Sequence, residues 1–229
     1  MTQKKIISFS LWGNDPKYCL GAIENARLAA EIYPDWICRF YTNADVSVET
    51  LGTLANFDNV ELCDMPSTCE GWKGMFARFF AVEDDVMISR DCDSRLSWRE
   101  KEAVDEWLES DKGFHVIRDH PWHTSVIMGG MWGCRNNALP EFLDLMLSWD
   151  REDRWQTDQE FLETEIWPLI TGDVMIHDSF YQHIPFLTLG IAKDFPTPCI
   201  NGCFVGQAFE ADGSVDQEHV KMLSEGPLL

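Results

Sequence analysis

The sequence is poor in basic residues. Its 229 residues include 18 Lys and Arg against 39 Asp and Glu, which gives a formal net charge of −21. A protein that binds nucleic acid through a basic groove needs the opposite balance, so the sequence excludes this class of function. The same charge repels a phosphate-bearing ligand unless a local cation, such as a bound divalent metal ion, reverses the field.

Long apolar runs and paired cysteine motifs are missing as well. No run approaches the roughly 18–20 apolar residues of a membrane helix, and the first apolar stretch is too short for a signal peptide. The eight cysteines contain no CxxC pair and lie mostly in apolar segments. We therefore expect a cytoplasmic protein with reduced cysteines and no membrane span. Cys199 and Cys203 have no second pair with which to form a zinc site.

The composition is that of a globular protein, with 45% hydrophobic residues and ten Trp. In the first half, short apolar strands alternate with helical segments. Strands are expected at 4–11, 36–42, 60–65 and 85–89, with helices over 14–33, 47–57 and 70–83 between them. This alternation predicts an α/β protein with a mostly parallel, Rossmann-like central sheet flanked by helices.

The second half is less regular. A strand is expected over 114–120 and helices over 98–110, 138–149 and 157–170, the last with a capping box from Thr157 to Glu160. No composition shift marks a linker. We expect one domain over 1–229, with a nucleotide-type half up to about residue 95 and a second half over 96–229 built onto it.

Two carboxylates, Asp91 and Asp93, directly follow the fourth predicted strand. Ligands of open parallel sheets bind beyond the carboxyl ends of the strands. Carboxylates at i and i+2 can both turn toward one hard cation, Mg²⁺ or Mn²⁺, which keeps coordination sites for substrate phosphate. Ser97 and Glu100 form a second capping box that begins the next helix. A short DxD also arises by chance in an acidic chain, so a solvated turn is the alternative.

The segment FARFFAVEDDVMISRDCDSRL resembles the part of GT-A glycosyltransferases in which an Arg-bearing helix precedes a strand ending in DxD. MGGMWGCR, TDQEFL and HDSF resemble, in this order, a group of bacterial and viral glycosyltransferases that includes the rhamnosyltransferase-like domain of large algal viruses. The resemblance runs from about residue 6 to about residue 206. It departs from the usual pattern at Cys92, between the two Asp, where the central residue need not touch the metal.

The resemblance implies a GT-A fold and a metal-dependent glycosyltransferase active in polysaccharide biosynthesis. A hexose or deoxyhexose would pass from a nucleoside diphosphate sugar, UDP-linked, to a hydroxyl of a glycan or lipid-linked acceptor, with inversion. Asp91 would contact the ribose or the metal, and Asp93 would ligate the metal. Arg78 would lie near the diphosphate. His177 would complete the metal site, with Asp178 as its rival.

The remaining assignments from the resemblance concern the base and the sugars. The loop after the first strand would hold the base through Ser10, Leu11 and Trp12. Gly129 and Gly130 would line the donor-sugar pocket, where glycine lets the backbone approach a ligand closely. The acceptor and sugar pocket is assigned to His120, His123 and Trp132.

Each assignment has a purely structural alternative. Arg78 could form a surface ion pair with Glu83 or Asp84, and His177 could be a hydrogen-bonded histidine at a strand end. The glycine pair could be a β-bulge. The two closely spaced histidines could, with Asp119, hold zinc, but a clear third ligand is missing.

Inversion requires a carboxylate that takes the proton from the acceptor hydroxyl. Asp158, at the start of the helix predicted over 157–170, is the first candidate, and Asp119 is the second. The helix dipole favours an acidic residue at this position without any catalytic role, and it lowers the pKa of the carboxyl group. Burial beside Trp155 would raise that pKa again.

Two rival functions follow from the same motif. A haloacid-dehalogenase-like phosphatase also has a strand-end DxD, but Ser94 and Arg95 stand where Gly-Thr or Gly-Val is usual, and the motif follows the fourth strand rather than the first. A non-catalytic nucleotide-sugar-binding protein of the same fold would release no free sugar from a donor.

Overall fold

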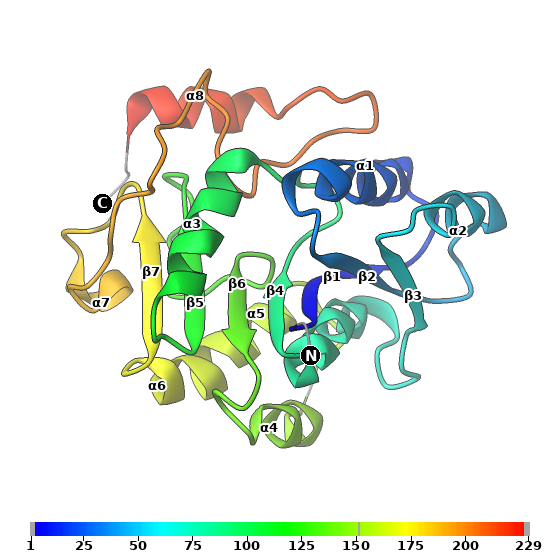
Figure 1. Cartoon of the computed structure of the whole chain (residues 1–229), viewed down its shortest axis with the longest axis horizontal. Helices are drawn as coiled ribbons and strands as arrows, with labels where there is room; N and C mark the ends of the chain where they lie inside the picture. Colours follow the sequence, from blue (N-terminus) through cyan, green and yellow to red (C-terminus); the bar gives the residue numbers. More distant parts are fainter. Residues whose placement is uncertain (1–2, 151, 227–229) are drawn as a thin grey trace.

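The computed structural model of the protein describes residues 3–150 and 152–226. A seven-stranded sheet forms its centre, in the order β3-β2-β1-β4-β6-β5-β7 (Figure 1). The strands are β1 (Lys5–Leu11), β2 (Ile37–Thr42), β3 (Val60–Asp64), β4 (Val86–Ser89), β5 (Phe114–Arg118), β6 (Trp132–Arg135) and β7 (Val174–Asp178). Only β6 runs antiparallel to its neighbours, β4 and β5. The mostly parallel α/β sheet expected from the sequence is confirmed.

Helices pack on both faces of the sheet (Figure 1). One face is covered by α1 (Pro16–Ile32), α2 (Val48–Leu54) and α3 (Trp98–Glu109). The other face is covered by η1 (Gly71–Glu83), α4 (Phe142–Ser148), α5 (Thr157–Phe161), η2 (Leu162–Ile166) and α6 (Trp167–Ile170). The helix expected over 70–83 is therefore present, but η1 winds as consecutive 3-10 turns. Two further helices, α7 (Pro185–Thr188) and α8 (Gln217–Glu225), follow β7.

Neighbouring residues of the central strands face opposite layers, as the two-residue period of a strand requires. Ile6 and Met87 pack against the layer of η1, whereas Ile7 and Ile88 pack against the layer of α1 and α3. Toward the carboxyl end of β1, the face turned to η1 becomes polar, because Ser8 Oγ donates to the carbonyl of Arg78 at 2.6 Å. The sheet thus changes from apolar to polar where a ligand would enter.

The helix termini explain two differences from the expected capping boxes. Ser97 Oγ caps α3 by accepting from the Glu100 amide at 3.2 Å. The Glu100 carboxylate, however, does not return to the cap, because it is buried in an ion pair with Arg90 at 2.6 Å. The residue before α5 is Gln156, in the left-handed region at φ 64°, and no side chain caps this helix. The capping box expected at Thr157 was therefore wrong.

None of the helices in the described part of the chain combines the length and the apolar character of a membrane span.

Candidate functional site

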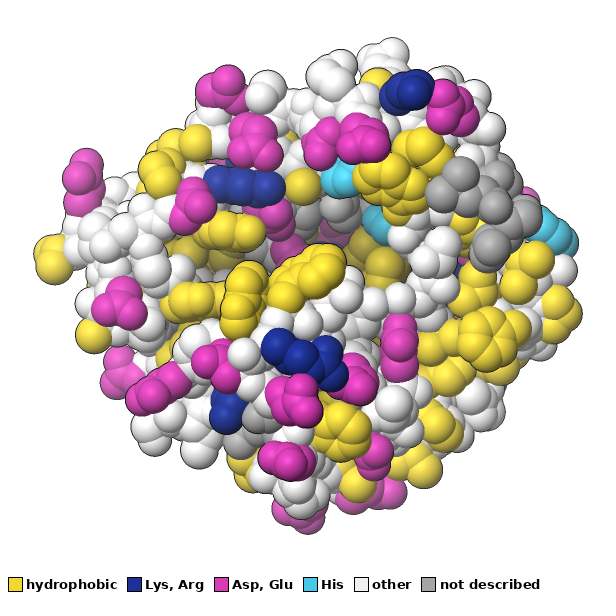
Figure 2. Space-filling model, turned by 180° about the vertical axis from the view of Figure 1, so that it is seen from behind, with side chains coloured by type: hydrophobic (Ala, Val, Ile, Leu, Met, Phe, Trp, Pro, Cys, Tyr) yellow, Lys and Arg dark blue, Asp and Glu magenta, His cyan; other side chains and the backbone are white. Residues whose placement is uncertain are grey.

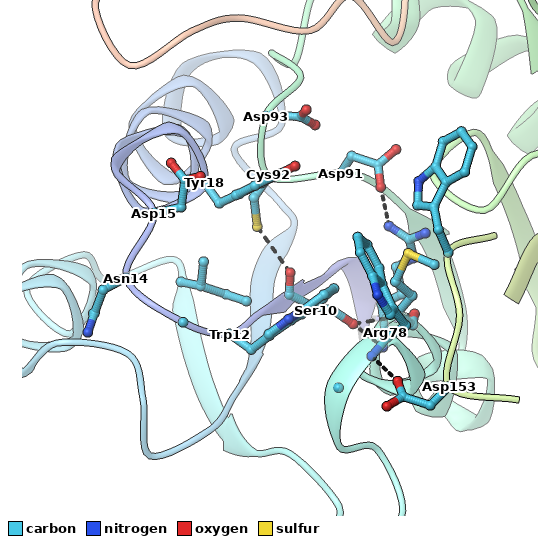
Figure 3. A pocket seen from close by; sticks show the side chains of 16 residues that line it. Ser10, Trp12, Asn14, Asp15, Tyr18, Arg78, Asp91, Cys92, Asp93 and Asp153 are labelled. Carbon is cyan, nitrogen blue, oxygen red and sulfur yellow. Dashed lines mark hydrogen bonds and ion pairs between the residues drawn. The ribbon is translucent and has the colours of Figure 1, made fainter. Parts of the chain in front are cut away.

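A cavity of about 650 Å³ opens beyond the carboxyl ends of β1 and β4, within the size range of small-molecule sites. The face of the molecule seen from behind is hollowed near its centre, with hydrophobic side chains around the hollow (Figure 2). Four parts of the chain supply the lining residues shown in Figure 3: Ser10, Leu11, Trp12, Gly13, Asn14, Asp15, Tyr18, Gly71, Trp72, Met75, Arg78, Asp91, Cys92, Asp93, Asp153 and Trp155. The predicted base-binding loop and the DxD therefore line one cavity.

Arg78 of η1 is the buried cation of this cavity, with only 5% of its surface exposed. Its Nη1 donates to the Asp91 carboxylate (Figure 3), and its Nη2 donates to Asp158 Oδ2 at 2.8 Å. Burial disfavours the charged guanidinium, but these two carboxylates hold the pKa of Arg78 above its usual value. Its Nε finds no hydrogen-bond partner among the described residues. A surface ion pair of Arg78 with Glu83 or Asp84 is not what the structure shows.

The backbone of the DxD is fixed from the protein interior. Arg90, one residue before the motif, is buried and donates to Glu100 and to the carbonyl of Trp132. The Cys92 thiol points inward and donates to the carbonyl of Ser10 at 3.4 Å (Figure 3). Because the central side chain points inward, the two flanking carboxylates of Asp91 and Asp93 are left to face the cavity.

The two carboxylates of the motif differ in their surroundings. Asp91 has 48% of its side chain exposed, whereas Asp93 has 19% and lies 3.3 Å from Lys17 Nζ in α1. Burial and the nearby charge of Asp91 raise the pKa of the Asp93 carboxyl group. Burial lowers the pKa of Lys17, but the charges of Asp93 and Glu210 outweigh this effect and hold it above its usual value. Lys17 opposes the rise in the pKa of Asp93 without cancelling it.

Gly129 and Gly130 lie directly against this ion-pair network. Ser89 Oγ of β4 donates to the carbonyl of Gly129 at 2.6 Å. A Cβ atom at Gly130 would lie 1.9 Å from Asp91 Oδ2, and one at Gly129 would lie 2.6 Å from Arg78 Nη2. No side chain larger than hydrogen fits at either position without moving charged groups. The structure thus brings the glycine pair into contact with Arg78 and Asp91. Their role in a donor-sugar pocket stays a prediction.

The structure does not bring His177 to the DxD. It lies in β7, and β6 and β5 separate this strand from β4. Its Nδ1 is hydrogen-bonded to His115 Nε2 at 2.8 Å, and its Nε2 lies 3.1 Å from a Glu106 oxygen of α3. Asp178, the rival ligand, is fully buried in an ion pair with Arg118 at 2.5 Å. The expectation that either residue completes the metal site is therefore corrected: both are structural.

Trp132 also lies away from the cavity. It is 1% exposed and stacks on Phe142 with ring centroids 5.4 Å apart. Its strand, β6, pairs with β4 on one side and β5 on the other. The indole packs in the core on the face of the sheet covered by α4 and η1. The assignment of Trp132 to a sugar pocket was wrong, because this residue faces the core and not the solvent edge of the sheet.

The two candidate bases are both buried in ion pairs, and neither lines the cavity. Asp158 is 2% exposed, beside Arg78, and burial raises its pKa although Arg78 opposes this shift. The expected neighbour Trp155 is 63% exposed. Asp119 accepts from Arg99 Nε and Nη2, both at 2.7 Å. Both carboxylates thus have arginine partners, and the role of either one as the base stays a prediction.

His120 and His123 form an aromatic cluster with Phe204 and with His219 of α8. His120 is buried and His123 is half-buried, and neither is among the residues that line the cavity. Their role in an acceptor pocket stays a prediction. Burial lowers the pKa of His123 to about 3, so its imidazole is neutral. Within residues 3–150 and 152–226, no three His, Cys, Asp or Glu side chains converge as a metal site.

Several cavity residues were not foreseen from the sequence. Asp153 Oδ1 accepts from the backbone amide of Trp72 at 2.7 Å, and this bond joins the loop before α5 to the start of η1. The exposed indoles of Trp72 and Trp155 line the same wall. These contacts join residues far apart in the sequence, so no local sequence pattern predicts them. Lys17 did carry a signal, because a cation in the first turn of a helix opposes the helix dipole.

The carboxylates of the cavity are suitable ligands for a divalent cation, but two residues would supply only part of its coordination shell. Asp91 and Asp93 supply carboxylate oxygens, and Mg²⁺ is commonly held by one or two carboxylates together with substrate phosphates and water. Each carboxylate has a basic partner in the structure, Arg78 or Lys17. A cation would therefore have to share or displace these partners.

No family model matches the chain, and no curated protein matches it. Its fold is similar to that of a glycosyltransferase involved in the glycosylation of the major capsid of PBCV-1, with 13% identity over 98% of this chain and 100% of that one and a TM-score of 0.50. The galactosyltransferase LgtC, solved with donor and acceptor sugar analogues, gives 14% identity over 98% and 97% of the two chains and a TM-score of 0.47. The GT-A fold expected from the sequence is confirmed.

Proposed function

From the GT-A fold and the cavity at the end of β4, we infer that the protein is a metal-dependent glycosyltransferase. It moves a hexosyl or deoxyhexosyl group from a nucleoside diphosphate sugar, UDP-linked, to a hydroxyl of a glycan or lipid-linked acceptor. The observation that carries this proposal is the convergence of one buried guanidinium and two carboxylates on a cavity of about 650 Å³. Such a site can hold a cation and a diphosphate together.

Arg78 is the residue that we assign to the diphosphate. It lines the cavity, it is buried, and its Nε has no partner among the described residues. A phosphate oxygen would satisfy a buried donor whose isolation is otherwise unfavourable. Asp158 holds the far side of the guanidinium and so orients it. In a protein with a net charge of −21, this local cation is what an anionic donor requires.

A bound Mg²⁺ or Mn²⁺ would supply further positive charge to the leaving diphosphate. Asp91 and Asp93 are the residues that would hold it. Most of the cavity lining precedes residue 95, and Asp153 and Trp155 form the wall contributed by the second half. We accordingly propose that the part up to about residue 95 binds the nucleotide, with Ser10, Leu11 and Trp12 at the base, and that the wall at 153–155 belongs to the acceptor side.

The stereochemistry of transfer depends on which carboxylate faces the acceptor. Asp158 and Asp119, the two bases considered for inversion, are engaged by Arg78 and Arg99 and lie outside the cavity lining. We therefore propose that Asp158 is a positioning residue for Arg78 and assign no base from this pair. Anomeric analysis of the product by NMR distinguishes inversion from retention.

The proposal is tested by calorimetric titration with a panel of UDP-sugars, with and without Mn²⁺. Wild type should bind only with Mn²⁺, and Asp93→Ala should lose this binding. Asp105→Ala is the matched control, because it removes a partly exposed acidic residue of α3 whose ion-pair partner is Lys101 of the same helix. Binding that needs no metal and survives Asp93→Ala would reject the proposal.

Turnover separates the proposal from its two rivals. A transferase should slowly hydrolyse its donor and release free sugar, whereas a pure binding protein should not. Release of phosphate from a generic aryl phosphate would instead favour the phosphatase. The Asp91 carboxylate, which would be its nucleophile, is tied to Arg78.

A further inference from the structure

Lys17 occupies a position that a helix disfavours. It lies in the first turn of α1, directly after Pro16, where the positive end of the helix dipole repels a cation. Its Nζ lies 3.3 Å from Asp93 Oδ2 and 3.4 Å from Glu210 Oε1. Two carboxylates from distant parts of the chain thus compensate the unfavourable dipole, and one of them belongs to the DxD.

Glu210 is brought there by backbone pairing with the motif itself. The Phe209 amide donates to the carbonyl of Asp93 at 2.8 Å, and Ala208 forms an isolated antiparallel bridge with Ser94. The Arg95 guanidinium lies 5.0 Å above the Phe209 ring. The segment leading into α8 therefore packs against the residues that follow the DxD. This places the Glu210 carboxylate near Lys17 Nζ, the same ammonium group that contacts Asp93.

The two carboxylates differ in how open they are. The Asp93 side chain is 19% exposed, and that of Glu210 is 55% exposed. A divalent cation placed between Asp91 and Asp93 would repel the Lys17 ammonium, because both would lie against the same partly enclosed carboxylate. Glu210 offers that ammonium a second partner at almost the same distance, on the solvent side.

We propose that Lys17 is an internal counterion of the DxD, which neutralises Asp93 while no divalent cation is bound and moves to Glu210 when one binds. The inference rests on the proposed function, because it presumes that Asp91 and Asp93 hold a cation. Its consequence is competition between Lys17 and the cation for one carboxylate. The same competition favours departure of the cation with the diphosphate after transfer.

The test is a titration of the full-length protein with Mn²⁺ alone, without donor, read by electron paramagnetic resonance of free Mn²⁺. Lys17→Gln should bind Mn²⁺ on the order of tenfold more tightly than wild type, as expected for removal of a partly buried competitor. Glu210→Gln should bind it about threefold more weakly, because Lys17 loses its alternative partner. Lys17→Arg keeps the charge and should not bind more tightly than wild type.

Lys101→Gln is the control for net charge, since Lys101 pairs with Asp105 on α3. Equal Mn²⁺ affinities of Lys17→Gln and Lys101→Gln would overturn the inference, as would weaker binding by Lys17→Gln or the absence of Mn²⁺ binding in all variants. Urea unfolding of each variant shows whether it is folded. If Lys17→Gln does not fold, the comparison between Lys17→Arg and wild type still tests the inference. Failure of the proposed function shows separately, as absence of UDP-sugar binding.

Discussion

Arg78 and Asp158 form a buried ion pair behind the cavity, with Nη2 of the arginine 2.8 Å from Oδ2 of the aspartate. Their exposed side-chain fractions are 6% and 3%. The other partner of Arg78, Asp91, is 48% exposed. The same guanidinium therefore has one carboxylate that fixes it in the interior and one that a ligand or solvent can reach.

This difference predicts unequal effects of removing the two carboxylates. Asp158→Ala leaves a buried charge with one partner fewer, and it should lower the free energy of unfolding by about 3–5 kcal/mol. Asp91→Ala should lower it by less than about 1 kcal/mol, because a half-exposed ion pair contributes little. Urea denaturation of both variants measures the difference, and equal losses would contradict the assigned positioning role of Asp158.

A methyl group at Gly130 should damage the site more than the fold. Its Cβ would lie 1.9 Å from Asp91 Oδ2, so Gly130→Ala must push this carboxylate aside. We expect UDP-sugar affinity to fall by more than about tenfold, with a loss of about 1–3 kcal/mol in the free energy of unfolding.

Gly52→Ala is the control for that experiment. A Cβ at Gly52 in α2 meets no atom within 4 Å, and φ is not positive there. This substitution should stabilise the protein by about 0.5–1 kcal/mol and leave donor binding unchanged. If calorimetry finds the same affinity for the two glycine variants, the cavity at Gly130 is not the donor site.

Acid should destabilise the protein through its buried histidines. Burial lowers the pKa of His177 from 6.5 to about 4. Below pH 6.5, His177 is therefore protonated in the unfolded chain but stays neutral in the folded protein. The free energy of unfolding decreases as the pH falls toward 4. The contribution of His177 to this loss is on the order of 3 kcal/mol.

Urea denaturation between pH 7 and pH 4 measures this effect. His177→Gln, which keeps a hydrogen-bonding side chain beside His115, should show a shallower decline of stability with falling pH than wild type. Parallel pH profiles of the two proteins would mean that the pKa of His177 is the same in the folded and unfolded states, which would contradict the predicted shift.

Thiol reactivity should separate the cysteine of the DxD from the exposed ones. Cys199 and Cys203 are exposed, whereas Cys92 is buried, and burial raises the pKa of its thiol well above the usual value. A disulfide reagent should label the two exposed thiols rapidly in the folded protein and all eight after unfolding. Peptide mapping identifies the sites, and rapid labelling of Cys92 would show that the DxD loop opens to solvent.

The first half of the fold could be predicted because its local signals agree with one another. Four strands and three intervening helices recur at the spacing of a parallel sheet, and Asp15 with Pro16 forms the start of α1 inside the helix predicted over 14–33. The position of Asp91 beyond β4 then follows from the strand order alone. Local sequence patterns are enough to predict the fold where each strand pairs with a strand nearby in the sequence.

The direction of individual side chains could not be predicted in the second half. Trp132 follows the glycine pair closely, yet the antiparallel insertion of β6 turns its indole into the core. His177 stands at the end of a strand, as a ligand would, but its ring faces α3 rather than the cavity. A shift of one residue along a strand reverses the face, and no local signal fixed the register of β6 or β7.

The hydrogen bond between the Phe209 amide and the carbonyl of Asp93 can form only late in translation. The motif leaves the ribosome over a hundred residues before the segment that holds its backbone, a delay on the order of 10 s at ordinary translation rates. During that interval the nascent chain carries the DxD without its fastening segment. The backbone of Asp93 can therefore gain this hydrogen bond only after the chain has been synthesised through Phe209.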